Sequence, residues 1–370
     1  MSFLQNIKPN RPTASLEGYF IAMLAKSKFG KTTFAIDLIR EHYKGDMSKG
    51  LLLATEIGYR AIDGVYAIPI TDFGYASGED DEQRGFIEVV DELIENKNDI
   101  PFRFVIIDTI TALERMAIKH TIQKSNREDN PDVRYTDISD IPWGKGYNKV
   151  AEEIYEQIER LTKNNFGVFI IGHEKVRTIE QRDGFKYDLI TFNVLGKTAD
   201  IIEREADMII YGDMVVSKDN NDLEIEDASG GVKVDRLLRF RSDGNILCGT
   251  RFKNFPAYIE HDASLFLETF ENAILELYDG NEDAVKKAKK DEENRRQKKN
   301  REDDKKKEQQ ENLEKEIASI KQQIAVNIGK ASSEERSQIG RKVKSILGYT
   351  NYNKSNDLDK LKEILELSKR

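Results

Sequence analysis

The feature that most restricts the fold of this chain is the stretch AKSKFGKTT (25–33), which joins an apolar run to an amphipathic one. The apolar run GYFIAML (18–24) precedes it, and FAIDLIREHY (34–43) follows with the spacing of a helix. A buried strand, a tight turn and a helix in this order are typical of one unit of a parallel α/β sheet. The backbone N–H groups of such a turn, with a helix N-terminus behind them, bind phosphate oxygens. The stretch therefore predicts a phosphate-binding loop.

The second half of this stretch fits the pattern GxxxxGK[ST] in full, and Ala25 stands where the pattern has its first glycine. In this pattern Lys31 contacts the β- and γ-phosphates and the hydroxyl of Thr32 binds Mg²⁺. We therefore expect ATP and Mg²⁺ as ligands, with a basic turn that binds nothing as the alternative. The residues predicted to bind the nucleotide are Ala25, Lys26, Ser27, Lys28, Phe29, Gly30, Lys31, Thr32 and Thr33.

A second apolar run ends in a carboxylate that suits the same site. In RFVIIDTITAL (103–113), four apolar residues lead into Asp108, as expected of a buried strand that ends at a metal. Asp108 is predicted to hold Mg²⁺ through a water, and its alternative role is a helix cap. Because both motifs occur in order with a β–α unit between them, the sequence favours a nucleotide site.

Residues 1–280 alternate short apolar runs with amphipathic stretches, which predicts an α/β domain. Apolar runs after residue 206, separated by the turn SDGN (242–245), predict antiparallel strands at one edge. We expect a mostly parallel central sheet with helices on both faces. The predicted buried strands are 18–24, 50–55, 102–108 and 166–172, and the predicted helices include 86–94 and 150–161.

The C-terminal part of the chain has a different composition. Residues 281–312 are mainly charged or amide residues, which predicts a linker that is either a solvated helix or a flexible tether. Residues 313–370 regain helical periodicity and predict three helices. The second of these begins at SSEE (332–335), a capping-box pattern, and ends at Gly348. A domain of this size suits the docking of a partner.

Composition limits the compartment and the class of partner. Cys248 is the only cysteine, which excludes an internal disulfide and is typical of a reducing compartment. The apolar runs are shorter than the roughly 20 residues that cross a bilayer, and the N-terminus lacks the apolar segment of a secretory signal. We expect a cytoplasmic protein that binds no membrane. A net charge of −9 argues against a protein that coats DNA, but it permits a local basic groove.

The order of these motifs over about residues 15–275 resembles the RecA-like P-loop ATPases, in particular phage-encoded AAA-type members associated with single-strand annealing and recombination. The resemblance implies a Mg-dependent ATPase that assembles into a ring or filament and acts on single-stranded DNA. ATP would be hydrolysed at the subunit interfaces, and DNA would stimulate the hydrolysis. A phage-encoded member would work in the host cytoplasm.

The resemblance also implies roles for two residues at strand ends. Glu56, which ends GLLLATE, lies where the family has the glutamate that activates the attacking water. His173, in FGVFIIGHEK, lies where many relatives have a glutamine that senses the γ-phosphate. The alternatives are a solvated charge for Glu56 and an ordinary hydrogen-bonded side chain for His173.

Two polar segments, predicted as loops, become candidates for contacts with single-stranded DNA. One is 174–193, which follows the sensor, and the other is 124–149, which holds the only tryptophan. Basic side chains neutralise phosphates and aromatic rings stack on unpaired bases. For Trp143 we expect local packing at the start of the next helix, with stacking as the alternative. The candidates are Lys175, Arg177, Arg182, Phe185, Lys186, Trp143, Lys145 and Tyr147.

Arg251 and Lys253, in GTRFKNFP, stand two residues apart in an expected strand, which would place them on one face. RecA-like filaments use a basic pair at a similar place to reach the γ-phosphate of the neighbouring subunit. A cation supplied in this way stabilises the charge that develops in phosphoryl transfer. The resemblance thus implies that hydrolysis requires assembly, and the alternative is plain surface charge.

Two other functions remain open. Lys26 occupies the place of the extra lysine in the K-G-G-x-G-K motif of ParA/MinD-type ATPases, which dimerise when they bind nucleotide, but Ser27 and Lys28 replace its two glycines. The other possibility is an ATP-gated scaffold with little turnover. Its C-terminal domain would recruit a replication partner, such as a single-strand-binding protein.

Overall fold

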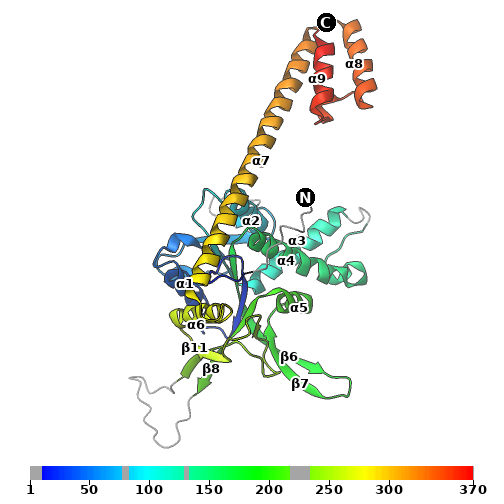
Figure 1. The fold of residues 1–370 in the computed structure, drawn as a ribbon. Helices are drawn as coiled ribbons and strands as arrows, with labels where there is room; N and C mark the ends of the chain where they lie inside the picture. The colour runs from blue at the N-terminus through cyan, green and yellow to red at the C-terminus, as the bar shows by residue number, and fades with distance from the viewer. Residues whose placement is uncertain (1–10, 77–82, 129–132, 217–233, 370) are drawn as a thin grey trace, which may run out of the picture. The chain divides into compact units, whose positions relative to one another are not determined.

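A computed structural model describes residues 11–76, 83–128, 133–216 and 234–369 of the chain (Figure 1). The chain divides into two compact units, Met1–Lys289 and Lys290–Arg370. Apolar clusters fill the interior of each unit. None of the described helices is long and apolar enough to cross a membrane.

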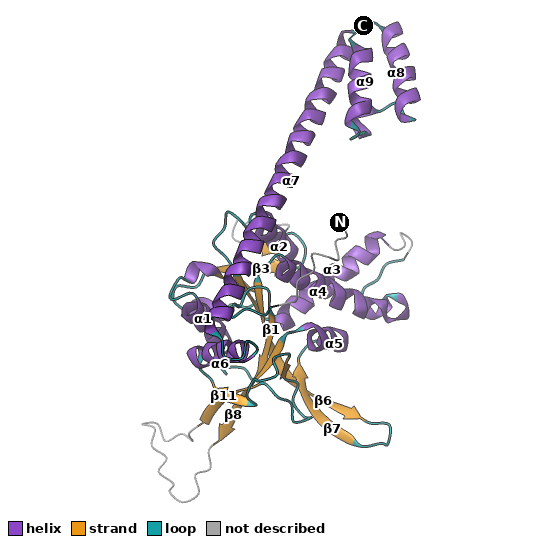
Figure 2. Cartoon of the chain, viewed as in Figure 1, coloured by secondary structure: helices purple, strands orange, loops and turns teal. Residues whose placement is uncertain are grey.

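Among the described residues, the first unit contains a sheet of 11 strands, most of them parallel. Its strands are drawn in orange in Figure 2. β1, β6, β5, β2, β3 and β4 lie in that order and pair in parallel, and β8 pairs in parallel with the other side of β1. The predicted mostly parallel sheet is therefore confirmed. These strands are β1 (Phe20–Ala25), β2 (Gly50–Ala54), β3 (Ala67–Asp72), β4 (Arg84–Gly85), β5 (Phe104–Asp108), β6 (Gly167–Glu180) and β8 (Met208–Val216).

Antiparallel strands complete the β8 edge. β9 (Val234–Arg239) and β10 (Gly249–Thr250) pair with β8, and β11 (Tyr258–Glu260) pairs with β9. The prediction of antiparallel strands after residue 206 is confirmed for β9, β10 and β11, whereas β8 is antiparallel to β9 and β10 but parallel to β1. β8 runs parallel to β1 because the helix α5 (Gly196–Glu205) precedes it and forms a crossover connection.

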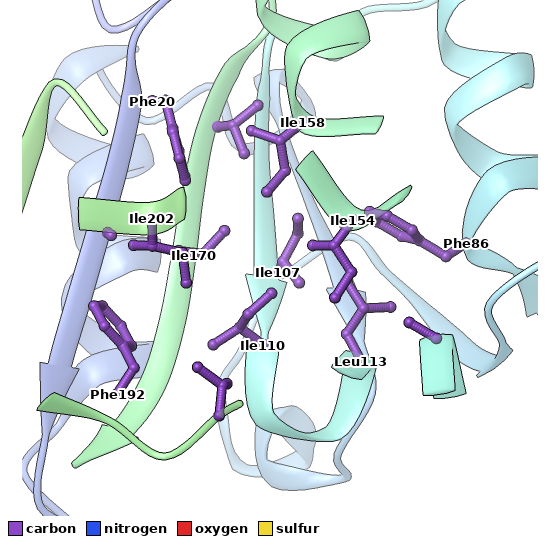
Figure 3. Close-up of a cluster of buried hydrophobic side chains, with 14 of the residues drawn as sticks. Phe20, Phe86, Ile107, Ile110, Leu113, Ile154, Ile158, Ile170, Phe192 and Ile202 are labelled. Atoms are coloured by element: carbon purple, nitrogen blue, oxygen red, sulfur yellow. The ribbon is translucent and has the colours of Figure 1, made fainter. Parts of the chain in front are cut away.

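Helices cover both faces of the sheet because alternate strand residues point to opposite sides. In β1, Phe20, Ala22 and Leu24 join the cluster under α2, α3, α4 and α5 (Figure 3), whereas Ile21 and Met23 join the cluster under α1 and α6. The prediction of helices on both faces is confirmed. These helices are α1 (Lys31–His42), α2 (Phe86–Glu95), α3 (Ile110–Glu128), α4 (Lys145–Lys163) and α6 (Ala263–Glu276), with short 3-10 turns at Met47–Lys49, Gly58–Ala61, Ile138–Asp140 and Pro142–Gly144.

The charged stretch after residue 280 is helical. α7 (Glu282–Lys330) includes it, so the solvated helix, and not the flexible tether, is the structure of residues 282–312. α8 (Ser333–Leu347) begins with Ser332 and Glu335 in a capping box and ends at Gly348 with φ 81°, as predicted. A 3-10 turn (Tyr352–Lys354) and α9 (Leu358–Ser368) follow. Apolar residues of α7, α8 and α9 form one cluster, while the proposed division at residue 313 stays a prediction.

Candidate functional site

The predicted phosphate-binding loop lies between the end of β1 at Ala25 and the start of α1 at Lys31. Gly30 has φ 103°, a left-handed conformation that favours glycine. Among the described residues, no side chain caps the first turn of α1, so its N–H groups point outward from the helix end without a side-chain acceptor. The loop therefore has the backbone of an anion-binding turn backed by a helix N-terminus.

Lys31 is buried at the base of this loop. Its ammonium donates hydrogen bonds to the carbonyl oxygens of Ala25 (3.1 Å) and Lys26 (2.9 Å). Burial lowers the pKa of Lys31, and the carboxylates of Asp108, Glu174 and Glu56 oppose that shift. Backbone carbonyls thus hold the side-chain nitrogen at the place where the motif requires a lysine.

The end of β5 lies beside the first turn of α1. Thr32 donates a hydrogen bond of 2.6 Å from its hydroxyl to the carboxylate of Asp108. Asp108 is buried, and burial raises its pKa, although the hydrogen bond from Thr32 and the charge of Lys31 act in the opposite direction. A hydroxyl and a carboxylate at this distance are the hard oxygen donors that Mg²⁺ uses. The residues therefore fit a Mg²⁺ ion.

A set of hydrogen bonds joins the end of β2 to the end of β5 and places Glu56. The hydroxyl of Thr55 accepts from the N–H of Thr109 at 2.6 Å and donates to its carbonyl at 3.0 Å. The hydroxyl of Thr109 in turn donates to the carboxylate of Glu56 at 3.0 Å. Nε2 of His173 lies 3.7 Å from the other carboxylate oxygen of Glu56. The structure thus brings together the predicted water activator and the predicted sensor.

A family model described as an AAA domain matches residues 17–252. The chain belongs to this AAA domain family. As an AAA domain it is a nucleotide-hydrolysing P-loop ATPase, and such ATPases use ATP, typically with Mg²⁺. No curated protein matches the chain. The narrower resemblance to phage recombination ATPases stays a prediction, as do the roles of the individual residues.

Two further side chains, Glu174 and Tyr211, lie at this site and were not predicted from the sequence. Glu174 follows His173, and its carboxylate acts on the charge of Lys31 and accepts a hydrogen bond from Tyr211 of β8. Together with its burial, this contact raises the pKa of Tyr211. Glu174 could have been found from its position next to His173 at the point where the buried part of β6 ends. The position of Tyr211 depends on the pairing of β8 with β1, which no local pattern encodes.

The prediction that Arg251 and Lys253 lie on one face of a strand is wrong. β10 ends at Thr250, and both residues belong to the turn that follows. The turn forms because Arg251 is held on the loop before β8. Its N–H donates to the carbonyl of Asp207 at 3.0 Å, and its guanidinium pairs with the carboxylate of Asp207 at 2.9 Å. Lys253 is exposed. Whether either residue acts on a neighbouring subunit stays a prediction.

The prediction of a loop at 174–193 is also wrong, because β6 continues to Glu180 and returns as β7 (Lys186–Phe192) in an antiparallel hairpin. Of its predicted DNA contacts, Arg177, Arg182 and Phe185 are exposed. Lys175 donates a hydrogen bond to the carbonyl of Val194, and Lys186 pairs with Glu180 at 3.1 Å.

The second predicted segment holds Trp143 in a 3-10 turn just before α4. Its side chain is 93% exposed, so the prediction of local packing is wrong. The reason is that Ile138 and Ile141, and not the tryptophan, fill the core at the start of α4. Lys145 is exposed beside it, while Tyr147 packs against the cluster under α2–α5.

Proposed function

We propose that this AAA domain protein is an ATPase controlled by single-stranded DNA, which it binds along the β6–β7 hairpin while annealing or exchanging strands. The observation that carries the proposal is the continuity of β6. The same strand holds His173 level with Ala25 of β1, at the phosphate-binding loop, and then extends to form the first arm of the hairpin. A ligand on the hairpin would therefore act on the strand that carries the predicted sensor.

The two faces of the hairpin differ in charge. Opposed residues of an antiparallel pair point to the same side, so Arg177, Ile179, Tyr187 and Leu189 share one face. The rings of Phe185 and Tyr187 stack on each other with centroids 6.3 Å apart. This face, with an exposed arginine and stacked rings, suits the phosphates and bases of an unpaired strand.

On the opposite face lie Glu180 and Asp188, the carboxylates of the two strands in the outer part of the hairpin. Thr178 donates to Asp188 at 2.8 Å there, and Glu180 pairs with Lys186. In residues 174–193 four basic and four acidic side chains cancel. DNA binding would therefore depend on the separation of charge between the two faces and not on net charge.

The proposed chemistry follows from the site residues. Lys31 and the loop N–H groups would bind the phosphates, and Thr32 and Asp108 would hold Mg²⁺. Mg²⁺ when bound would neutralise charge on the phosphates. Glu56, held by the hydroxyl of Thr109, orients a water and takes up its proton. His173 contacts Glu56 and reports the state of the site to the hairpin.

The test is the steady-state ATPase rate of the full chain with and without single-stranded DNA, at low and moderate salt. We expect stimulation that weakens as salt rises, and loss of turnover in Lys31→Ala. The double variant Arg177→Ala/Arg182→Ala should keep the basal rate and lose stimulation, whereas Thr178→Ala on the opposite face should keep both. Unchanged turnover with DNA, at any salt, would exclude this function.

A second candidate is the ATP-gated scaffold, and one observation favours it. The C-terminal unit has a groove of about 720 Å³ lined by Leu313, Ile317, Ala318 and Asn356, and the side chain of Leu313 is 43% exposed. ATP binding without any effect of DNA would favour this scaffold. A dimer that forms only with ATP would instead favour the ParA/MinD type, for which Lys26 is exposed at the loop.

A further inference from the structure

Strand pairing places Arg236 beside the phosphate-binding loop. In the sheet, Ala25 of β1 is level with Gly212 of β8, and Gly212 is level with Leu238 of β9. Because β9 is antiparallel, Arg236 pairs with Met214, two residues beyond the level at which β1 ends. Arg236 therefore lies beyond the C-terminal end of β1, where the phosphate-binding loop begins.

Arg236 also lies on the same side of the sheet as the loop and α1. Leu238 is buried in the cluster that includes Phe29 and Phe34, and residues two apart in a strand point to the same face. A Cβ atom built on Gly30 would lie 3.5 Å from Nη1 of Arg236. The guanidinium thus reaches the residue that directly precedes Lys31.

His261 lies beside this arginine at the loop. Its backbone N–H donates to the backbone carbonyl of Arg236 at 3.0 Å, and its ring packs edge-on against Phe29 with centroids 4.8 Å apart. Burial, and then the charge of Arg236, lower the pKa of His261. The guanidinium of Arg236 stays protonated at any ordinary pH, so it places a permanent positive charge beside Gly30.

The charge of Arg236 is available to a ligand. The residue is exposed, and its guanidinium forms no ion pair or hydrogen bond with the residues that the structure describes. Arg239 on the same strand differs, because it pairs with Asp213 at 2.6 Å. An exposed arginine held against a phosphate-binding loop is suited to a charge-assisted hydrogen bond with phosphate oxygens.

We propose that Arg236 binds the phosphate chain of the nucleotide held by its own subunit. The inference rests on the proposed ATP binding and adds a residue to it. It differs from the predicted role of Arg251 and Lys253, which would act on a neighbouring subunit. Nucleotide binding would then be complete within one chain, and assembly would be needed only for hydrolysis.

The experiment is a titration of the full chain with fluorescent ATP and ADP analogues, at low and high salt. Arg236→Ala should raise Kd by about tenfold, equivalent to ~1.4 kcal/mol, and Arg236→Lys should recover part of the loss. The difference from wild type should shrink at high salt because the contact is ionic. Arg127→Ala, which removes an exposed arginine near the far end of α3, should bind as wild type does.

The outcomes separate this inference from the proposed function. Wild-type protein that binds neither analogue would exclude the ATP site itself. Wild-type protein that binds, with Arg236→Ala equally tight, would overturn the role of Arg236 alone. A mixture of Arg236→Ala and Lys31→Ala chains tests whether Arg236 acts on the nucleotide of its own subunit or of a neighbouring one. Recovery of tight binding in the mixture would show that it acts on the neighbour, and would also overturn the inference. If Arg236→Ala and Arg236→Lys both have the Tm of the wild type, misfolding is excluded as the cause of weaker binding.

Discussion

Thr32 and Asp108 are joined by a hydrogen bond of 2.6 Å, although they lie 76 residues apart in the chain. The bond links the first turn of α1 to the end of β5, so the two motifs meet at one point. Thr32 is the residue that follows Lys31, and Asp108 acts on the charge of that lysine. The residue predicted to bind phosphate and the residues predicted to bind the metal are therefore neighbours at one turn of α1.

Removal of the Thr32 hydroxyl should abolish most turnover while the fold persists. In Thr32→Ala the metal loses one oxygen donor, and we expect the ATPase rate to fall by about tenfold or more, since a bound metal contributes several kcal/mol to such reactions. Thr32→Ser keeps the hydroxyl and should keep most of the rate. The comparison is made at saturating ATP over a range of Mg²⁺ concentrations. A Thr32→Ala enzyme with the wild-type Mg²⁺ dependence would contradict the assignment.

Asp108 should reduce the stability of the nucleotide-free protein. Burial raises its pKa in the folded chain above the ordinary value of 3.8. The folded chain then holds the proton more strongly, and the free energy of unfolding falls as pH rises through the interval between the two pKa values. Asp108→Asn should therefore raise Tm at pH 7, by about 2–4 °C for each kcal/mol recovered.

The pH dependence of this effect provides its control. Below the unfolded-state pKa the wild-type carboxyl is protonated in both states, so the advantage of Asp108→Asn should disappear. Asparagine still offers an oxygen to the Thr32 hydroxyl, so that hydrogen bond need not be lost. Thermal unfolding of both proteins without nucleotide or metal, followed from pH 7 downward, measures the difference. A lower Tm for the variant at pH 7 would show that the carboxylate stabilises the fold.

Glu56→Gln should separate binding from hydrolysis. The glutamine can still accept from the Thr109 hydroxyl, but it cannot take a proton from water. Because general-base catalysis contributes typically 10²–10⁴-fold, we expect a fall in the ATPase rate of roughly that size. The affinity for ATP, measured by titration, should change little. Retained turnover would leave Glu174, a further carboxylate near Lys31, as the candidate base.

The residues at strand ends were the predictable part of this site. Glu56 and Asp108 come at the ends of apolar runs, and Lys31 comes after the loop that follows another such run. The carboxyl ends of parallel strands lie at the same side of a sheet, so a local pattern is sufficient to place these residues together. The same reasoning gave the sheet and its two covered faces. Strand order then decided which of these ends were neighbours.

Arg236 and the hairpin could not be predicted in the same way. Arg236 reaches the loop only because β9 is antiparallel to β8 in one particular register. The hairpin resembled a polar loop because most side chains of its outer half are polar and exposed to solvent, which hides the alternation of a half-buried strand. Trp143 was misplaced because the choice between neighbouring apolar residues depends on tertiary packing.

Gly212 should be essential to the shape of the phosphate-binding loop. A Cβ atom at this position would lie 2.5 Å from Cε1 of Phe29 and 2.8 Å from Cβ of Ala25, so no side chain fits without a shift of the loop. Phe29 is fully buried in the cluster under α1 and α6. Gly212→Ala should therefore cost about 1–3 kcal/mol of stability, as overpacking does, and should weaken nucleotide binding as well.

Gly249→Ala is the matched control, because Gly249 lies in β10 of the same sheet and a Cβ there would meet nothing within 4 Å. We expect it to bind nucleotide and to unfold as the wild type does. Thermal unfolding and titration with a fluorescent ATP analogue measure both properties for each variant. If Gly212→Ala lost stability but bound nucleotide with the wild-type Kd, the loop would tolerate displacement of Phe29. The contact between β8 and the loop would then be structural alone.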